Sequence, residues 1–268
     1  LRRVGFTRIS VGMQSAAPRV LAVLDRKHRP GRPEEVVLEA RAAGFEHLSL
    51  DLIYGSPYET DADWQESLEA AIGARPDHIS AYALVVEQGT ALARQVATGV
   101  VPPPDDDVQA DRYVMADETL RAAGYDWYEI SNWARGDAAR CRHNDLYWSD
   151  ANWWGIGPGA HSHVSGVRWW NVKHPVRYTS MVDGGRSPAA GRETLDDGAR
   201  YTERVMLGIR RSEGLDASGL PVAARAVVPQ LASWGLLEPD ALHAGRLVLS
   251  QRGRLMADAV VKELLTAG

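Results

Sequence analysis

Alternating apolar and polar residues predict three strands in the first third of the chain. In the second strand Leu48, Leu50 and Leu52 alternate with Ser49 and Asp51, as expected of a strand that buries one face. We expect the apolar faces to lie beneath helices, whereas the small or polar faces line an open space. The predicted strands are Thr7–Gln14, His47–Tyr54 and His78–Val86.

Helical patterns separate these strands. Pro33–Ala43 has a proline near its start, acidic residues in its first turn and Gly44 after its end, and Ala62–Ala74 carries an apolar stripe. Strands that alternate with helices predict a parallel sheet, as a barrel or a doubly wound sheet. Because a closed eight-stranded barrel fills its centre with bulky side chains, the polar faces favour an open or wide barrel around a polar ligand.

The remainder of the chain predicts a more irregular α/β arrangement. Its last part, Arg246–Leu265, predicts a strand, a turn at Gly253 and a final helix, which resembles a winged helix. This part is not notably basic, so we expect it to be structural rather than a DNA-binding element. Before it we expect a loop over Leu92–Pro104, a helix over Asp105–Ala123, a strand over Tyr125–Ile130, a loop over Ser131–Arg142 and a helix over Leu195–Ile209.

Composition limits the classes of protein. The 268 residues carry a net charge of −5, which fits one large domain or one domain with a small appendage and gives no reason to expect a nucleic-acid partner. No apolar run reaches the roughly 20 residues of a membrane span. The single cysteine fits a reducing cytoplasm. Leu1–Val4 followed by Gly5 resembles the end of a helix, so we expect the sequence to continue a longer chain.

Two polar residues stand out on the predicted strands. Asp51 lies within an apolar strand, and a buried carboxylate needs a cation or hydrogen-bond donors. It either pairs with an arginine or accepts hydrogen bonds from a ligand. Gln14 ends its own strand in the same layer. Since barrel active sites lie at the carboxyl ends of strands, both residues are candidates for ligand binding.

The segment His143–Trp148 (HNDLYW) is the most distinctive of the chain. A neutral imidazole can bind zinc or haem iron. Zinc needs three or four ligands, and His161 and His163 lack a third partner. Haem needs an imidazole, an aromatic or apolar wall and cations for its propionates; a histidine packed in an aromatic core is the alternative. Candidate wall residues are Tyr147, Trp148, Trp153 and Trp154, and candidate cations are Arg135, Arg140 and Arg142.

Gly155–Ala160 (GIGPGA) does not fit a dinucleotide fingerprint. Its third glycine comes one residue too early, Pro158 interrupts it, and no helix is predicted after it. The glycines either let the backbone approach a ligand or form a tight turn in the core.

Seven sequence blocks occur in the order typical of the HemW branch of the radical S-adenosylmethionine (SAM) family. The blocks are RISVGMQS, LDRKH, SLDLIYGSP, HISAYALVVEQGT, YEISNWAR, CRHNDLYW and WGIGPGAHS. The chain resembles this branch over nearly its whole length, and the branch is similar to the oxygen-independent coproporphyrinogen III oxidase. The resemblance implies strands four to six of a partial (βα)6 barrel in residues 1–104, a covering region in residues 105–194, and a small α+β, winged-helix-like domain in residues 195–268.

The resemblance also implies two ligands of this chain, haem and SAM. Haem is expected at the HNxxYW motif, with His143 as the candidate ligand of the iron. A [4Fe–4S] cluster is expected only in the full-length family protein, because the CxxxCxxC motif is absent and Cys141 alone cannot hold a cluster. The motif residues are His143, Asn144, Tyr147 and Trp148, and the residues expected to bind SAM are Gln14, Arg26, Asp51, Tyr82, Val85 and His161.

The resemblance implies a cytoplasmic haem chaperone that binds haem and SAM and delivers haem to acceptors such as respiratory or membrane-bound proteins. One alternative is an oxidoreductase, the oxygen-independent oxidase (dehydrogenase) that decarboxylates coproporphyrinogen III in porphyrin biosynthesis. A binding protein without catalysis is the other alternative. HNDLYW favours the chaperone.

Overall fold

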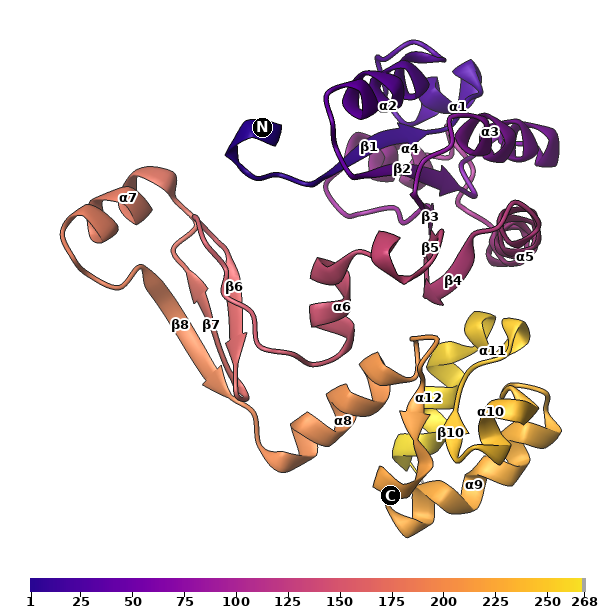
Figure 1. Cartoon of the computed structure of the whole chain (residues 1–268), viewed down its shortest axis with the longest axis vertical. Coiled ribbons are helices and arrows are strands. Elements are labelled where there is room, and N and C mark those ends of the chain that lie inside the picture. Colours follow the sequence, from indigo (N-terminus) through magenta and orange to yellow (C-terminus); the bar gives the residue numbers. More distant parts are fainter. Residues whose placement is uncertain (267–268) are drawn as a thin grey trace. The chain divides into compact units, whose positions relative to one another are not determined.

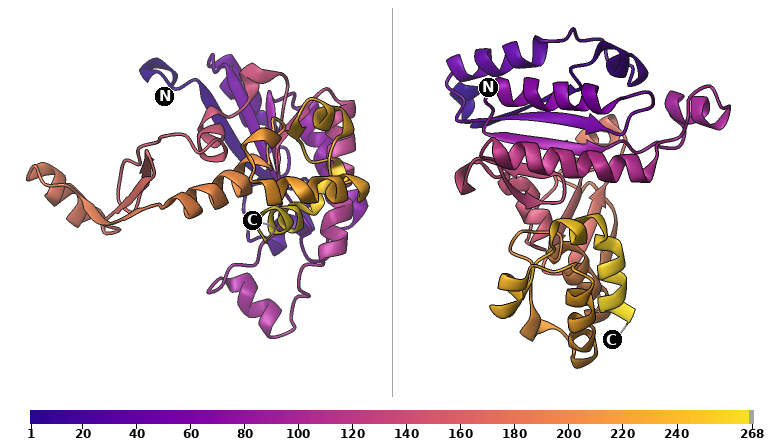
Figure 2. Two further views of the ribbon diagram at one scale, coloured as in Figure 1. Left: turned by 90° about the horizontal axis from the view of Figure 1, so that it is seen from below. Right: turned by 90° about the vertical axis from the view of Figure 1, so that its right-hand side faces the viewer.

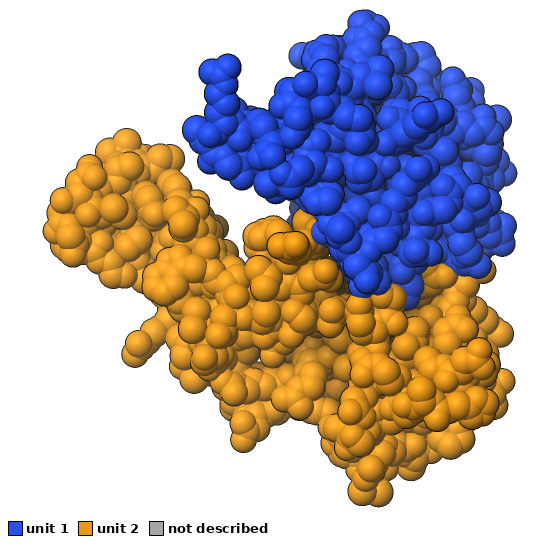
Figure 3. Space-filling view, in the orientation of Figure 1, with its two compact units in different colours: residues 1–140 blue, residues 141–268 orange. Residues whose placement is uncertain are grey.

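The computed structural model describes residues 1–266. The chain forms two compact units, residues 1–140 and residues 141–268, which Figure 3 colours separately. The expected division of the chain into three parts stays a prediction.

An open, mixed sheet forms the centre of the first unit (Figure 1). The first three strands run parallel, β5 is antiparallel to β3, and β4 is antiparallel to β5. The sheet order is β1-β2-β3-β5-β4, and no closed barrel forms within residues 1–266. The strands are β1 (Arg8–Gln14), β2 (His47–Tyr54), β3 (His78–Ala83), β4 (Asp126–Glu129) and β5 (Asn132–Ala134).

Helices cover the apolar face of this sheet, as predicted (Figures 1 and 2). Leu48, Leu50 and Leu52 of β2 are buried in one core with Trp64 and Leu120 from two of these helices. The helices of the unit are η1 (Arg2–Val4), α1 (Pro18–Val23), α2 (Arg32–Ala42), α3 (Asp61–Gly73), α4 (Ala91–Ala97), α5 (Asp106–Ala122) and η2 (Asp137–Ala139).

Side-chain caps determine where two of the covering helices begin. Thr60 accepts a hydrogen bond from the Asp63 amide, and the Asp63 carboxylate accepts one from the Thr60 amide, so α3 begins with a capping box. Asp105 accepts hydrogen bonds from the amides of Asp107 and Val108 at the start of α5. Both helices therefore begin within one residue of the predicted position.

A three-stranded antiparallel sheet and a helical module make up the second unit. The sheet consists of β6 (His161–Val164), β7 (Val167–Asn171) and β8 (Ala189–Thr194). The helices are α6 (Arg142–Trp148), α7 (Pro175–Asp183), α8 (Asp197–Gly208), η3 (Ala217–Gly219), α9 (Val222–Ser233), α10 (Pro239–His243), α11 (Gln251–Leu255) and α12 (Ala257–Thr266), and the short strands β9 (Leu215–Asp216) and β10 (Arg246–Leu247) pair antiparallel.

The C-terminal module has its own core, in which α12 packs against α8 and α9. Leu231, Leu247, Val260 and Leu264 are buried there. The predicted strand and final helix are present. The predicted turn at Gly253 is wrong: Ser250 accepts a hydrogen bond from the Gly253 amide at 3.0 Å, and this cap starts α11.

Two expected loops contain regular structure. Thr90 accepts a hydrogen bond from the Ala93 amide at 3.1 Å and starts α4, most of which lies in the loop predicted over Leu92–Pro104. Asn132–Ala134 forms β5 because it pairs with β3, a contact that local sequence does not encode. None of the helices in residues 1–266 is both long and apolar enough to cross a membrane.

Candidate functional site

The strand register brings three candidate residues to one face of the first sheet. Gly12 of β1 pairs with Asp51 of β2, and Ile53 of β2 pairs with Tyr82 of β3. Because alternate residues of a regular strand share a face, Asp51 and Tyr82 face the side opposite the helices. The register shifts after Gly12, so Gln14 pairs with Leu52, but the Gln14 side chain folds back over Gly12 on the face of Asp51. The structure therefore places on one face Gln14 and Asp51, which the polar alternation indicated, and Tyr82, which the family resemblance indicated; their binding of SAM stays a prediction.

Asp51 accepts its hydrogen bonds from serines. Ser10 Oγ donates to Asp51 at 2.6 Å and Ser49 Oγ at 3.4 Å. Within residues 1–266 Asp51 has no ion pair with an arginine, so the expected alternative of a purely structural arginine pair is not what forms. The half-buried Asp51 carboxylate is accessible to a ligand that donates hydrogen bonds.

A buried polar network, which the sequence alone did not predict, reaches Asp51 through Ser49. His78 Nδ1 lies 2.8 Å from Ser49 Oγ, and His78 Nε2 lies 2.8 Å from the Tyr128 hydroxyl. Since Ser49 donates to Asp51, it accepts from Nδ1–H, and Nε2 accepts from Tyr128. Burial, and secondarily the charge of Arg8, lower the pKa of His78 to about 3. His78 is thus a neutral member of the network.

Arg26 and Val85 line a pocket of about 870 Å³ beside this face. Ile53 also lines the pocket, and it shares the face of Asp51 on β2. The polar face of the sheet therefore continues into the pocket at the carboxyl end of β2, where ligands of parallel sheets bind. Gln14, Asp51 and Tyr82 lie on the sheet face rather than in the pocket wall.

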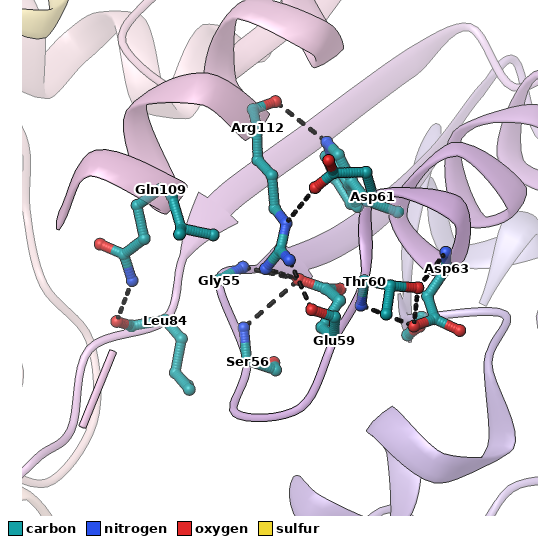
Figure 4. Close-up of polar contacts among 12 residues, drawn as sticks. Gly55, Ser56, Glu59, Thr60, Asp61, Asp63, Leu84, Gln109 and Arg112 are labelled. Carbon is teal, nitrogen blue, oxygen red and sulfur yellow. Dashed lines mark hydrogen bonds and ion pairs between the residues drawn. The ribbon is translucent and has the colours of Figure 1, made fainter. Parts of the chain in front are cut away.

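A buried ion pair holds the loop that follows β2 (Figure 4). Arg112 of α5 donates to Glu59 at 2.7 Å, and the side chains of Arg112 and Glu59 are only 5% and 0% exposed. Glu59 also accepts hydrogen bonds from the amides of Gly55 and Ser56 at 2.8 and 3.3 Å. Burial raises the pKa of Glu59 to about 7, and Arg112 opposes this rise.

Helix α5 holds the end of β3 in a similar way. The Gln109 amide donates to the Leu84 carbonyl at 2.9 Å, as Figure 4 shows. Leu84 and Val85 line the 870 Å³ pocket. One helix thus holds the segments after both β2 and β3, and the segment after β3 borders the pocket.

The HNDLYW motif forms helix α6 of the second unit, with Cys141 as its N-cap residue. Residues four apart share a helix face, so His143 lies beside Tyr147, and the Tyr147 hydroxyl lies 3.0 Å from His143 Nε2. The Tyr147 ring in turn meets Trp153 edge to face, with ring centroids 4.8 Å apart. Asn144 and Trp148 are half-buried and do not line the pocket next to His143.

An aromatic pocket of about 480 Å³ adjoins this helix. His143 is exposed in its wall, so it is not a histidine of an aromatic core. Trp154 is 70% exposed and Ile156 84% exposed beside it, an apolar surface of the kind that binds a ligand or partner. The lining residues are His143, Leu146, Tyr147, Trp153, Trp154, Gly155, Ile156, Ala160 and His161.

The glycine-rich turn lines this pocket together with His161, which we expected to bind SAM. Gly155 approaches the next strand so closely that a Cβ there would lie 1.8 Å from the His161 carbonyl oxygen. The Asn171 amide donates to the Gly157 carbonyl at 3.0 Å and holds the turn. His161 consequently lies in the second unit beside His143, whereas the other five residues expected to bind SAM lie in the first unit. Contact of His161 with SAM stays a prediction.

The three arginines considered as cations for the haem propionates do not all belong to the same unit. Arg135 and Arg140 lie in the first unit, over the rings of Tyr125 and Tyr128. Arg142 is exposed on α6 in the second unit. Of the three, only Arg142 belongs to the unit that contains the pocket.

A [4Fe–4S] cluster does not fit the residues of this chain. Such clusters are held by several cysteine thiolates, and the sequence has a single cysteine, Cys141. Among residues 1–266 no three histidine, cysteine or acidic side chains are grouped to hold a metal ion.

The fold and the first unit define the class of the protein. A model of the radical SAM superfamily matches residues 1–71. The structure of coproporphyrinogen III oxidase (HemN) from Escherichia coli, a radical SAM enzyme, superposes with a TM-score of 0.77 over 99% of this chain and 64% of that chain. At 20% sequence identity this similarity establishes the fold, and it confirms the predicted partial radical SAM fold.

Sequence comparison then identifies the family. The haem chaperone HemW of Mycobacterium tuberculosis (strain CDC 1551 / Oshkosh) is 52% identical over 265 residues, which cover 99% of this chain and 67% of that protein. HemW of Synechocystis is 35% identical over 82% of this chain and 54% of its own length. The chain belongs to the HemW family of radical SAM proteins, as its sequence blocks predicted.

Proposed function

We propose that this protein is a haem chaperone, which binds haem in the aromatic pocket of the second unit and delivers it to acceptor proteins. The proposal rests chiefly on one observation: His143 and Tyr147 of the HNxxYW motif line the 480 Å³ pocket together with Trp153 and Trp154. A flat apolar macrocycle buries the exposed indole surface, and an imidazole supplies a ligand for its iron. The names of the HemW relatives support the same function.

The His143–Tyr147 hydrogen bond orients the candidate ligand. The phenol engages His143 Nε2 at 3.0 Å, so Nδ1 is the nitrogen left for iron in this arrangement, or else Nε2 exchanges the phenol for iron. The exposure of the pocket suits a carrier, because haem has to leave for an acceptor. Haem-requiring respiratory or membrane-bound proteins stay the proposed acceptors, and a cytoplasmic location stays a prediction.

SAM is the second proposed ligand, bound on the polar face of the first sheet. The Asp51 carboxylate can accept from its ammonium or hydroxyl groups, Gln14 can donate or accept, and Arg26 can pair with its carboxylate. Tyr82 and Val85 add to the surroundings. When bound to a cluster, SAM supplies radical chemistry in this superfamily; the residues of this chain bind and orient it without holding that cluster.

A haem titration followed by a transfer assay tests the chaperone function. Haem added to the wild type should shift the Soret band saturably, and His143→Ala should weaken binding at least tenfold, since an axial ligand is lost. His174→Ala, on the exposed N-cap of α7, is the matched control. The loaded protein should then pass haem to an apo-haem protein. An absent or unsaturable shift, or equal affinity in His143→Ala, contradicts the proposal.

The oxidase alternative rests on the fold alone, because HemN is 20% identical to this chain. The HNDLYW motif and the 52% identical HemW relative favour the chaperone. Supplying a cluster-loaded full-length protein with coproporphyrinogen III tests the alternative. Turnover to protoporphyrinogen contradicts a function limited to haem transfer.

A further inference from the structure

The pocket beside helix α6 contains a second imidazole outside the HNxxYW motif. His161 begins β6 and lines the same 480 Å³ pocket as His143 and Tyr147. We propose that His161 is an iron ligand for haem in this pocket. The inference rests on the proposed haem-binding function and assigns it a ligand beyond the motif.

The two imidazoles differ in what occupies their nitrogen atoms. His143 Nε2 is 3.0 Å from the Tyr147 hydroxyl, so iron competes with a phenol for this nitrogen. Within residues 1–266 the ring nitrogens of His161 make no hydrogen bond, and the residue is exposed in the pocket wall. His161 therefore has a lone pair available without breaking an existing contact.

Backbone pairing and a stacked indole hold the His161 ring in position. Its backbone pairs with Trp170 in the β6–β7 ladder, and its ring stacks on the Trp170 indole with centroids 5.9 Å apart and planes 30° apart. The close approach of Gly155 to the His161 carbonyl fixes the turn before it. A ligand on a paired strand is held more precisely than one on a free loop.

The neighbouring His163 differs from His161 in its burial. His163 is 5% exposed, its Nδ1 lies 3.3 Å from the Ala151 carbonyl, and it does not line the pocket. In the described part of the chain His163 Nε2 is also without a hydrogen-bond partner, but it is buried and does not line the pocket, whereas His161 is exposed there. Of the two, His161 is the exposed residue, it has no hydrogen bond to its ring nitrogens among residues 1–266, and it lines the aromatic pocket.

Coordination by His161 needs no oxidant or reductant. The neutral imidazole nitrogen donates a lone pair to ferric iron and displaces a bound water, so the iron keeps its oxidation state. With His143 as the other ligand, the iron has two imidazole ligands and is low-spin. Removal of His161 leaves a five-coordinate or water-bound, high-spin iron.

The test compares haem complexes of the wild type, His161→Phe and His174→Phe. Phenylalanine keeps an aromatic ring against Trp170 but has no lone pair. The wild type and His174→Phe should show a low-spin ferric spectrum, and His161→Phe a high-spin spectrum with roughly tenfold weaker haem affinity. In His161→Ala, added imidazole should restore the low-spin spectrum, which a merely structural role of His161 does not predict.

The outcomes separate this inference from the function on which it rests. If the wild type binds haem and His161→Phe has the same spectrum and affinity, the assignment of His161 is wrong and the haem site stands. If the wild type itself does not bind haem saturably, the proposed function fails. If imidazole does not restore the spectrum of a folded His161→Ala complex, the role of His161 is structural and the assignment is again wrong.

Discussion

The two candidate sites are built in different ways. On the first sheet, Asp51 accepts hydrogen bonds from Ser10 and Ser49, and Ser49 also contacts the buried His78. The loop after β2 is held by the Glu59 side chain, which is 0% exposed. In the second unit, Trp154 is 70% exposed. The first site is therefore organised before its ligand arrives, whereas the second keeps apolar surface in solvent that its ligand is expected to bury.

This contrast predicts that substitutions around the first site mainly affect the free energy of unfolding, whereas substitutions in the aromatic pocket of the second unit mainly affect haem binding. The largest effect is expected for Arg112→Met, which leaves the Glu59 carboxylate buried without its guanidinium. Breaking such a pair costs about 3–5 kcal/mol in the free energy of unfolding. Urea unfolding measures the change, and Arg29→Met, which breaks an exposed pair with Glu35, should cost less than about 1 kcal/mol. Similar costs for both variants contradict a special role of the buried pair.

The pH dependence of stability tests the network beneath Asp51. The pKa of His78 is lowered to about 3 by burial, so below pH 6.5 the unfolded chain binds a proton that the folded protein does not. The free energy of unfolding should therefore fall by about 1.4 kcal/mol per pH unit as the pH drops from about 6.5 toward 3. This slope should be smaller in His78→Gln and unchanged in His174→Gln, as measured by urea unfolding at pH 7.0 and 5.5. An equal slope in His78→Gln rules out this source of acid sensitivity.

Trp154→Ala should weaken haem binding while leaving the free energy of unfolding almost unchanged. Because Trp154 is 70% exposed, its truncation should change the free energy of unfolding by no more than about 0.5 kcal/mol. Loss of an indole from the pocket wall should weaken haem binding about fivefold to tenfold. Trp234→Ala, in the C-terminal module outside the pocket, should leave haem affinity unchanged. A haem affinity of Trp154→Ala equal to the wild type places the macrocycle elsewhere.

The smallest effect is expected for Gly12→Ala. A Cβ at Gly12 would lie 2.6 Å from Gln14 Nε2, so the flexible Gln14 side chain has to move. Stability should change by less than about 1 kcal/mol, while SAM affinity should fall about threefold by calorimetry. Unchanged SAM affinity means that Gln14 is not a SAM ligand.

The local sequence pattern was sufficient to predict an element where that element is regular and buries one face. The bounds of β2 match the prediction, and the leucines of β2 lie beneath helices as expected. Strand β5 was missed because its three residues are a strand only through pairing with β3. Helix α4 was missed because most of it lies in Leu92–Pro104, a segment with a loop-like composition, although the Thr90 cap just before this segment starts a helix.

The candidate sites were predictable to different degrees. Alternation indicated Gln14 and Asp51, but the His78 network and the Glu59–Arg112 pair come from residues far apart in sequence, which no local pattern connects. The HNDLYW motif indicated His143 and Tyr147. The position of His161 beside them depends on how the glycine turn folds onto β6, which the spacing does not reveal.

The haem dissociation constant of matched variants from the two units tests the central claim most directly. Haem is titrated into the wild type, His143→Ala and Asp51→Asn, and the Soret band is followed. A haem site in the pocket of the second unit predicts at least tenfold weaker binding for His143→Ala and an unchanged constant for Asp51→Asn. Weaker binding in Asp51→Asn with an unchanged constant in His143→Ala would place the haem on the first sheet and contradict the account.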